Sequence, residues 1–159
     1  MNLSEFFEDK HGNIVLITNY VPEEKENLVR FYEKFDAERR CCGLPPVKRE
    51  AIEQWIDYLS EKGYGFIAKV GDEVVGHIGV VPYGNEAEFV IFVRKDYEGL
   101  GIGKELIRFA SEFLKRVGVE KLVAITEAFN KKAIETYLSL GFAVTGRQGL
   151  YVHLEKMLS

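Results

Sequence analysis

The stretch Glu98-Gly99-Leu100-Gly101-Ile102-Gly103-Lys104 says more about the fold of this 159-residue chain than any other. The apolar, β-branched run Phe89-Val90-Ile91-Phe92-Val93 precedes it, and an amphipathic helical pattern follows it directly. A strand that turns through glycines into a helix exposes several backbone N–H groups at the positive end of the helix dipole. Such a turn is a favourable site for a phosphate group. We therefore predict a phosphate-binding loop over residues 98–104.

Two common glycine-rich nucleotide motifs do not fit this loop. A Walker loop needs a glycine, four residues and then Gly-Lys-Ser/Thr, but Gly103-Lys104 is followed by Glu105 and the first position is Glu98. A dinucleotide fingerprint needs a third glycine where Lys104 stands. The simplest alternative is that the glycines only form a tight turn between a strand and a helix.

Composition is typical of one globular domain, which we expect to cover residues 1–159. The formal net charge of −4 argues against general binding of nucleic acid. No apolar run approaches the ~18 residues of a membrane span, and the start lacks a signal-peptide pattern. Cys41 and Cys42 are adjacent and have no metal-ligand spacing around them, so we expect no metal site and free thiols in a reducing cytoplasm.

Hydrophobic periodicity predicts an α+β fold, with a mixed and mostly antiparallel central sheet flanked by helices. Expected strands cover residues 13–20, 64–70, 73–81, 86–94, 122–126, 142–145 and 149–154. Expected helices begin near Pro22, cover 52–59, run from Ile102 to Gly118, and run from Asn130 to Gly141. Turns are expected at residues 71–72 and 82–85.

A second motif lies downstream of the loop. Residues 130–142 match the pattern N-x-x-A-x-x-x-Y-x-x-x-G-F, from Asn130 through Tyr137 to Phe142. With both motifs in place, the chain resembles the GNAT superfamily of acetyl-CoA-dependent N-acetyltransferases over nearly its whole length. The family's loop begins with Gln or Arg, where this chain has Glu98. Residues 87–97 and the opening from His11 resemble the protein-lysine acetyltransferases of bacteria and archaea, which implies a protein lysine ε-amine as acceptor.

The resemblance implies a binding site for acetyl-CoA, which leaves as coenzyme A. Its pantetheine arm would pair with the backbone of Ile91, Phe92 and Val93. The pyrophosphate would be held by the amides of the loop, which comprises Glu98, Gly99, Leu100, Gly101, Ile102, Gly103 and Lys104. Asn130 would contact the pantetheine arm, although a plain helix cap would also explain this asparagine.

Catalysis would require a base for the amine and a proton donor for the departing thiolate. The resemblance implies that Glu88 is the general base and that Tyr137 is the donor, with direct transfer and no acyl-enzyme. Glu86 lies on the same strand face by period-two alternation and is a rival base, as is His77. A structural role remains open for each, since Tyr137 also lies on the apolar face of its helix.

Three further alternatives stay open at this stage. The acceptor is expected to be a protein lysine, but a small-molecule amine or an N-terminal amine fits the same motifs. A non-catalytic domain that senses acetyl-CoA would also carry the loop. Members of the family often form dimers, so the resemblance implies a possible homodimer. We expect no membrane or nucleic-acid partner.

Overall fold

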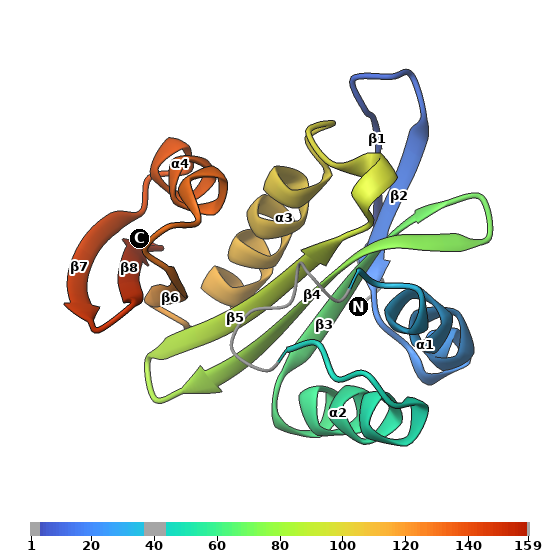
Figure 1. Ribbon diagram of the computed structural model, residues 1–159, viewed down its shortest axis with the longest axis horizontal. Coiled ribbons are helices and arrows are strands. Elements are labelled where there is room, and N and C mark those ends of the chain that lie inside the picture. The colour runs from blue at the N-terminus through green and yellow to red at the C-terminus, as the bar shows by residue number, and fades with distance from the viewer. Residues whose placement is uncertain (1–3, 37–43, 159) are drawn as a thin grey trace.

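The computed structural model describes residues 4–36 and 44–158. In these ranges one sheet has the strand order β1-β2-β3-β4-β5-β6-β8-β7, and every neighbouring pair is antiparallel except β5 and β6 (Figure 1). The strands are β1 (Ser4–Glu8), β2 (Ile14–Asn19), β3 (Tyr64–Val70), β4 (Glu73–Tyr83), β5 (Glu86–Val93), β6 (Lys121–Glu127), β7 (Ala143–Gln148) and β8 (Tyr151–Met157). The predicted α+β fold with a mixed, mostly antiparallel sheet is confirmed.

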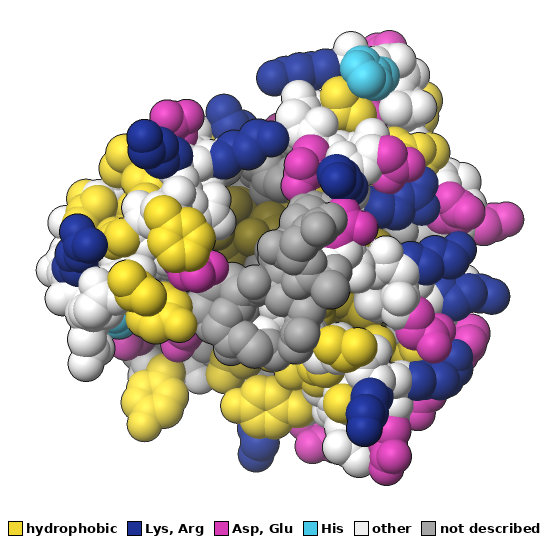
Figure 2. All heavy atoms as spheres, in the orientation of Figure 1, with side chains coloured by type: hydrophobic (Ala, Val, Ile, Leu, Met, Phe, Trp, Pro, Cys, Tyr) yellow, Lys and Arg dark blue, Asp and Glu magenta, His cyan; other side chains and the backbone are white. Residues whose placement is uncertain are grey.

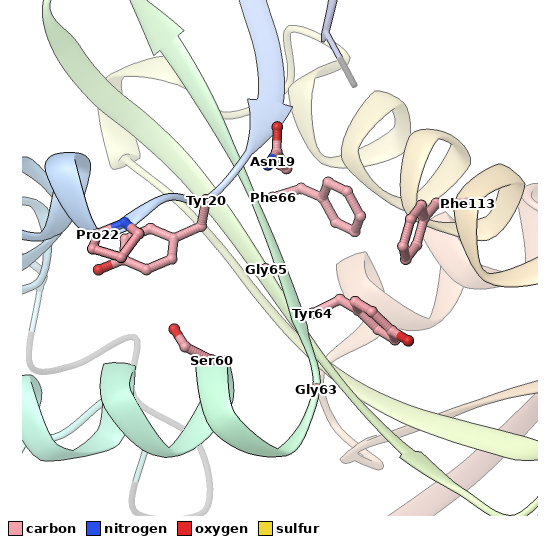
Figure 3. A pocket seen from close by; sticks show the side chains of 9 residues that line it. All are labelled: Asn19, Tyr20, Pro22, Ser60, Gly63, Tyr64, Gly65, Phe66 and Phe113. Atoms are coloured by element: carbon pink, nitrogen blue, oxygen red, sulfur yellow. The ribbon is translucent and has the colours of Figure 1, made fainter. Parts of the chain in front are cut away.

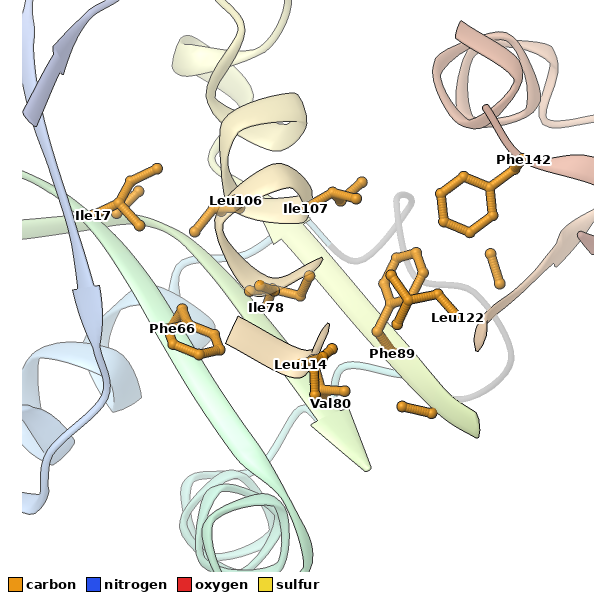
Figure 4. Close-up of a cluster of buried hydrophobic side chains, with 14 of the residues drawn as sticks. Ile17, Phe66, Ile78, Val80, Phe89, Leu106, Ile107, Leu114, Leu122 and Phe142 are labelled. Carbon is orange, nitrogen blue, oxygen red and sulfur yellow. The ribbon is translucent and has the colours of Figure 1, made fainter. Parts of the chain in front are cut away.

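Helices cover both faces of this sheet. The helices are α1 (Lys25–Glu33), α2 (Arg49–Lys62), α3 (Ile102–Arg116) and α4 (Lys131–Ser139), with 3-10 turns η1 (Pro22–Glu24) and η3 (Lys95–Tyr97). The apolar stripe of α3 packs on one face, where Leu106 and Leu114 join a core with Phe66 and Ile78 (Figure 4). Helices α1 and α2 pack on the other face around a smaller cluster. None of the described helices is both long and apolar enough to cross a membrane.

The structure corrects several sequence-based boundaries. The last two strands, predicted over 142–145 and 149–154, run over Ala143–Gln148 and Tyr151–Met157. Strand β1 was not predicted, because SEFFE is short and acidic and leaves Phe6 67% exposed. It forms a strand because it pairs antiparallel with β2, with Glu8 opposite Ile14. Pro82 and Tyr83 belong to β4 rather than to a turn. Strand β3 reaches only the Tyr64–Val80 pair, so the side of Pro82 that lacks an N–H faces no neighbouring strand.

The smaller cluster holds a buried polar pair, Tyr32 and His77. The tyrosine hydroxyl is hydrogen-bonded to Nδ1 of His77, and the rings of Trp55 and Phe92 pack edge-on against Tyr32. His77 is 2% exposed, and burial lowers the pKa of its imidazole to about 3. The neutral form is therefore part of the core, since a buried imidazolium would lose its hydration without gaining a counter-charge from any residue in the described ranges.

Lowering the pH from 7 to 5 should reduce the free energy of unfolding by about 2 kcal/mol through His77 alone. The unfolded imidazole takes up a proton near pH 6.5, whereas the folded one takes it up near pH 3. The contribution of neutral His77 to the free energy of unfolding is therefore fully present above pH 6.5 and is lost as the pH falls toward 3. Urea unfolding at both pH values measures the change. His77→Gln should flatten this dependence, and His11→Gln, in an exposed turn, should keep it; equal slopes in both variants would contradict the assignment.

Candidate active site

The parallel pair β5 and β6 is joined over only a short stretch. Glu86, Ala87 and Glu88 lie opposite Lys121, Leu122 and Val123, and beyond these residues the two strands diverge. Strand β4, in contrast, stays paired with β5 as far as Val93. One edge of β5 is therefore without a partner strand in the described part of the chain. From Glu88 to Phe92 this edge is about 13 Å long, at roughly 3.3 Å per residue.

The register of β5 shows which peptide groups face the gap. The N–H of Arg94 donates to the carbonyl of Val75 on β4 at 2.8 Å. Since peptide groups alternate sides along a strand, Phe89, Ile91 and Val93 direct theirs to the opposite side, where β6 has moved away. An extended ligand could add to this edge as a further strand.

Phe92 is placed differently from its neighbours Ile91 and Val93. It lies opposite His77 in the β4–β5 ladder, and its ring joins the aromatic cluster under α1. Of the three residues predicted to pair with the pantetheine arm, Ile91 thus presents its peptide groups to the gap, and Val93 directs its own to the same side of the strand. Phe92 presents neither its peptide groups nor its ring.

The glycine loop closes one end of the gap. Gly99 and Gly101 have φ values of 74° and 97°, a left-handed conformation that a side chain would strain. Gly101 immediately precedes α3, and its carbonyl accepts the first helical hydrogen bond, from the N–H of Glu105 at 3.1 Å. The N–H groups of residues 99–104 find no acceptor among the residues that the structure describes. The loop can therefore offer several donors to one anion.

Charged side chains surround the loop. The Glu98 carboxylate lies 3.8 Å from the ammonium of Lys132 in α4. The glycine loop and the first turn of α4 are therefore close to each other at this end of the gap. Lys104 is exposed. Arg94 is bound by Asp96 at 2.8 Å and by Glu73 at 3.1 Å, and these carboxylates raise its pKa. Figure 2 shows the surface hollowed between α4 and the segment 95–101, with hydrophobic side chains at depth.

Asn130 caps α4. Its side-chain oxygen accepts a hydrogen bond from the N–H of Ala133 at 3.2 Å, which is the helix-capping role that the sequence allowed. The ion pair between Glu98 and Lys132 brings the first turn of α4 close to the glycine loop. The cap and a contact with a ligand in the gap are compatible, since the cap uses only the amide oxygen.

Tyr137 lies on α4 at the other end of the gap. Its ring centroid is 5.8 Å from that of Phe89 on β5 and 5.5 Å from that of Phe142. Burial raises the pKa of Tyr137 to about 12. The hydroxyl therefore keeps its proton at neutral pH and can donate a hydrogen bond.

The candidate bases lie on the opposite face of the sheet. Side chains alternate along β5, so Glu86 and Glu88 face α2 whereas Phe89, and Tyr137 packed against it, lie on the α3 face. Lys121 binds Glu86 at 3.1 Å and Glu155 at 3.3 Å. Glu88 is exposed and forms no ion pair with any described residue. Of the two glutamates, Glu88 has the carboxylate that is available to a substrate.

A cavity of about 480 Å³ borders both glutamates. Its walls include the aromatic side chains of Trp55, Tyr58 and Tyr83. The sequence predicted no site role for these three residues: Trp55 and Tyr58 fall in the helix expected over 52–59, and Tyr83 falls in the turn expected over 82–85. No local pattern in the sequence connects them, because only the fold brings α2, which carries Trp55 and Tyr58, next to the end of β4, which carries Tyr83.

Other candidates lie away from the gap or outside the described residues. His77 is enclosed under α1, so its ring does not reach the split. A second cavity of about 480 Å³ lies where α2 ends and β3 begins, and its lining includes Tyr20, Ser60, Tyr64 and Phe113 (Figure 3). Among the described residues, its lining contains no carboxylate and no basic side chain. Cys41 and Cys42 lie outside the described residues.

Comparisons with known proteins identify the family of this chain and support its fold. Rat N-acetyltransferase 8 is 32% identical over 97 residues, which cover 56% of this chain and 44% of that protein. The chain thus spans about half the length of the curated relatives it matches. The GNAT domain of S. lividans PAT superposes with a TM-score of 0.86 at 18% identity, covering 98% of this chain and 97% of that one.

A solved structure with a ligand is also similar. YncA from Salmonella typhimurium, determined with its cofactor acetyl-CoA, has a TM-score of 0.74 and 18% identity over 91% of this chain and 94% of that one. At such identities the two structures support the fold alone. The profile described as the acetyltransferase (GNAT) family matches residues 28–142, which is most of the chain. The protein therefore belongs to the acetyltransferase (GNAT) family.

Proposed function

We propose that the protein transfers the acetyl group of acetyl-CoA directly to an amine. One observation carries the proposal: β5 and β6 diverge beyond Glu88, with donor amides at one end of the gap and Glu88 and Tyr137 on its two faces at the other. Family membership and the acetyl-CoA bound to YncA support it. Acetyl-CoA supplies the acetyl group as a thioester.

The residues of the gap suit the cofactor. The amides of residues 99–104 would bind the pyrophosphate, and the exposed Lys104 would add a positive charge. The peptide groups of Ile91 would pair with the pantetheine arm, and Asn130 would contact it from α4. The Glu98 carboxylate lies 3.8 Å from the ammonium of Lys132 in the first turn of α4.

Each chemical step of the proposed transfer can then be assigned to a group of this chain. Glu88 takes the proton of the amine, directly or through a water, because an ammonium group cannot attack. A peptide N–H on the open edge of β5, such as that of Ile91, stabilises the negative charge that develops on the carbonyl oxygen. The hydroxyl of Tyr137 donates to the departing thiolate. Positioning, rather than covalent catalysis, lowers the barrier.

For the acceptor, we propose a lysine ε-amine of a protein. The aromatic walls of Trp55, Tyr58 and Tyr83 suit an alkyl stem with a cationic head, and Glu88 and Glu86 stand where the head would arrive. The net charge of −4 favours the approach of basic protein segments. A small-molecule amine or an N-terminal amine is the second candidate. A cytoplasmic location and a homodimer remain predictions from the sequence.

The acceptor class can be decided by measuring thiol release from acetyl-CoA. Three acceptors are compared: a peptide with a blocked N-terminus and one free lysine, a peptide with a free N-terminus and no lysine, and a small diamine. The proposal predicts turnover with the first. Preference for either of the others would reassign the acceptor. Tight binding of acetyl-CoA without turnover on any of them would indicate a sensor rather than an enzyme.

Replacing Glu88 by glutamine should lower kcat by about 100-fold or more, the range expected for loss of a general base. Binding of acetyl-CoA should be unchanged, since the side chain lies on the face opposite Tyr137. Glu86→Gln is the matched control, because that carboxylate is already bound by Lys121. Stopped-time assays across pH 6–10 measure the effect. If Glu86→Gln were the more damaged variant, the assignment of the base would have to be reversed.

Replacing Gly103 by proline should raise the dissociation constant of coenzyme A by about tenfold, the effect of one lost hydrogen bond to a charged group. The N–H that is removed lies in the first turn of α3, where proline is tolerated and the helix needs no donor. Glu50→Pro removes the N–H at the same position of α2 and should leave affinity unchanged. Titration calorimetry measures both. Unchanged affinity in a folded Gly103→Pro protein would contradict the loop's role.

A further inference from the structure

The turn between β1 and β2 is organised around one buried carboxylate. Asp9 is only 5% exposed. One of its oxygens accepts the N–H groups of His11 and Asn13, each at 2.9 Å, and the other accepts the side-chain amide of Asn13 at 2.8 Å. Burial alone would raise the pKa of Asp9, but these hydrogen bonds lower it. The carboxylate therefore fixes the shape of this turn.

This turn touches the glycine loop. The N–H of Lys10, next to Asp9, donates to the carbonyl of Leu100 at 3.3 Å. A second contact holds the hairpin against α3, since Arg108 binds Glu5 of β1 at 2.7 Å. The hairpin is thus tied to both the loop and the helix that follows it.

The hydrogen bond to Leu100 sets the direction of a donor in the loop. In a trans peptide the carbonyl and the following N–H point in opposite directions. When Lys10 holds the carbonyl of Leu100, the N–H of Gly101 must point away from the hairpin. This peptide plane turns about ψ of Leu100 and φ of Gly101. Because Gly101 has no side chain, its φ is less restricted than that of other residues, and the hydrogen bond from Lys10 selects one orientation of the plane.

We infer that Asp9 is a positioning residue for cofactor binding: through the Lys10–Leu100 hydrogen bond it aims the Gly101 N–H at the pyrophosphate of acetyl-CoA. The inference rests on the proposed function. Asp9 itself touches no substrate. It acts by keeping the turn in the shape that presents the N–H of Lys10 to the loop.

The test compares two acyl donors. Acetyl-CoA uses the loop, whereas acetyl-pantetheine has the same thioester arm without the diphosphate. Asp9→Ala should raise KM for acetyl-CoA and the dissociation constant of coenzyme A by about tenfold. The kcat with acetyl-CoA and kcat/KM with acetyl-pantetheine should stay within about twofold of the wild type.

Three companion variants complete the experiment. Asp9→Asn keeps an oxygen for both backbone N–H groups and should restore most of the affinity. Asn13→Ala loses only the 2.8 Å side-chain bond and should raise the dissociation constant by about two- to threefold, which keeps the inference testable if Asp9→Ala fails to fold. Asp72→Ala, in the exposed turn between β3 and β4, is the matched control and should bind like the wild type.

Two results would overturn the inference. One is wild-type affinity for coenzyme A in folded Asp9→Ala or Asn13→Ala. The other is an equal loss of activity with both donors, which would indicate general distortion instead of a misdirected phosphate donor. If the wild-type protein itself bound no coenzyme A, the proposed function would fail first and this inference would fail with it.

Discussion

The lost pairing between β5 and β6 is the constraint on which the rest of the site depends. Backbone N–H and C=O groups within a sheet need partners, and over residues 89–93 one side of β5 has none from β6. A sheet that ended here would expose an edge open to any strand. In this fold the edge is instead bordered by α4 and by the glycine loop, so an extended ligand of suitable length and charge can fill it.

The same strand separates two kinds of chemistry. On one face, Phe89 and Tyr137 border the place where the thioester would lie, and on the other Glu88 opens into the cavity of Trp55. Alternation of side chains along a strand is enough to produce this division. In the proposed reaction, the acetyl donor and the amine acceptor would thus reach the split from opposite sides of the sheet. The buried Tyr32–His77 pair supports β4, the neighbour of this strand in the sheet, which is a structural role for a histidine that the sequence left open as a base.

Local signals explain what could be predicted from the sequence. The glycines before Ile102, the apolar period of α3 and the cap at Asn130 act within a few residues, and they were placed correctly. Strand β1 is specified by its partner rather than by its own residues, and it was missed. Glu86 forms an ion pair with Lys121, whereas Glu88 does not. Lys121 is distant in sequence and becomes a neighbour of Glu86 only through the parallel pairing of β5 and β6. The link from Asp9 to the loop is equally non-local.

Hydrogen–deuterium exchange of individual amides, followed by NMR with and without coenzyme A, tests the central claim most directly. Saturation with coenzyme A should slow exchange at Ile91, Gly101 and Gly103, because each would gain an acceptor from the ligand. The amide of Phe92, already facing β4, should change little. Binding of coenzyme A that leaves the exchange of Ile91 and of the loop amides unaltered would contradict the account.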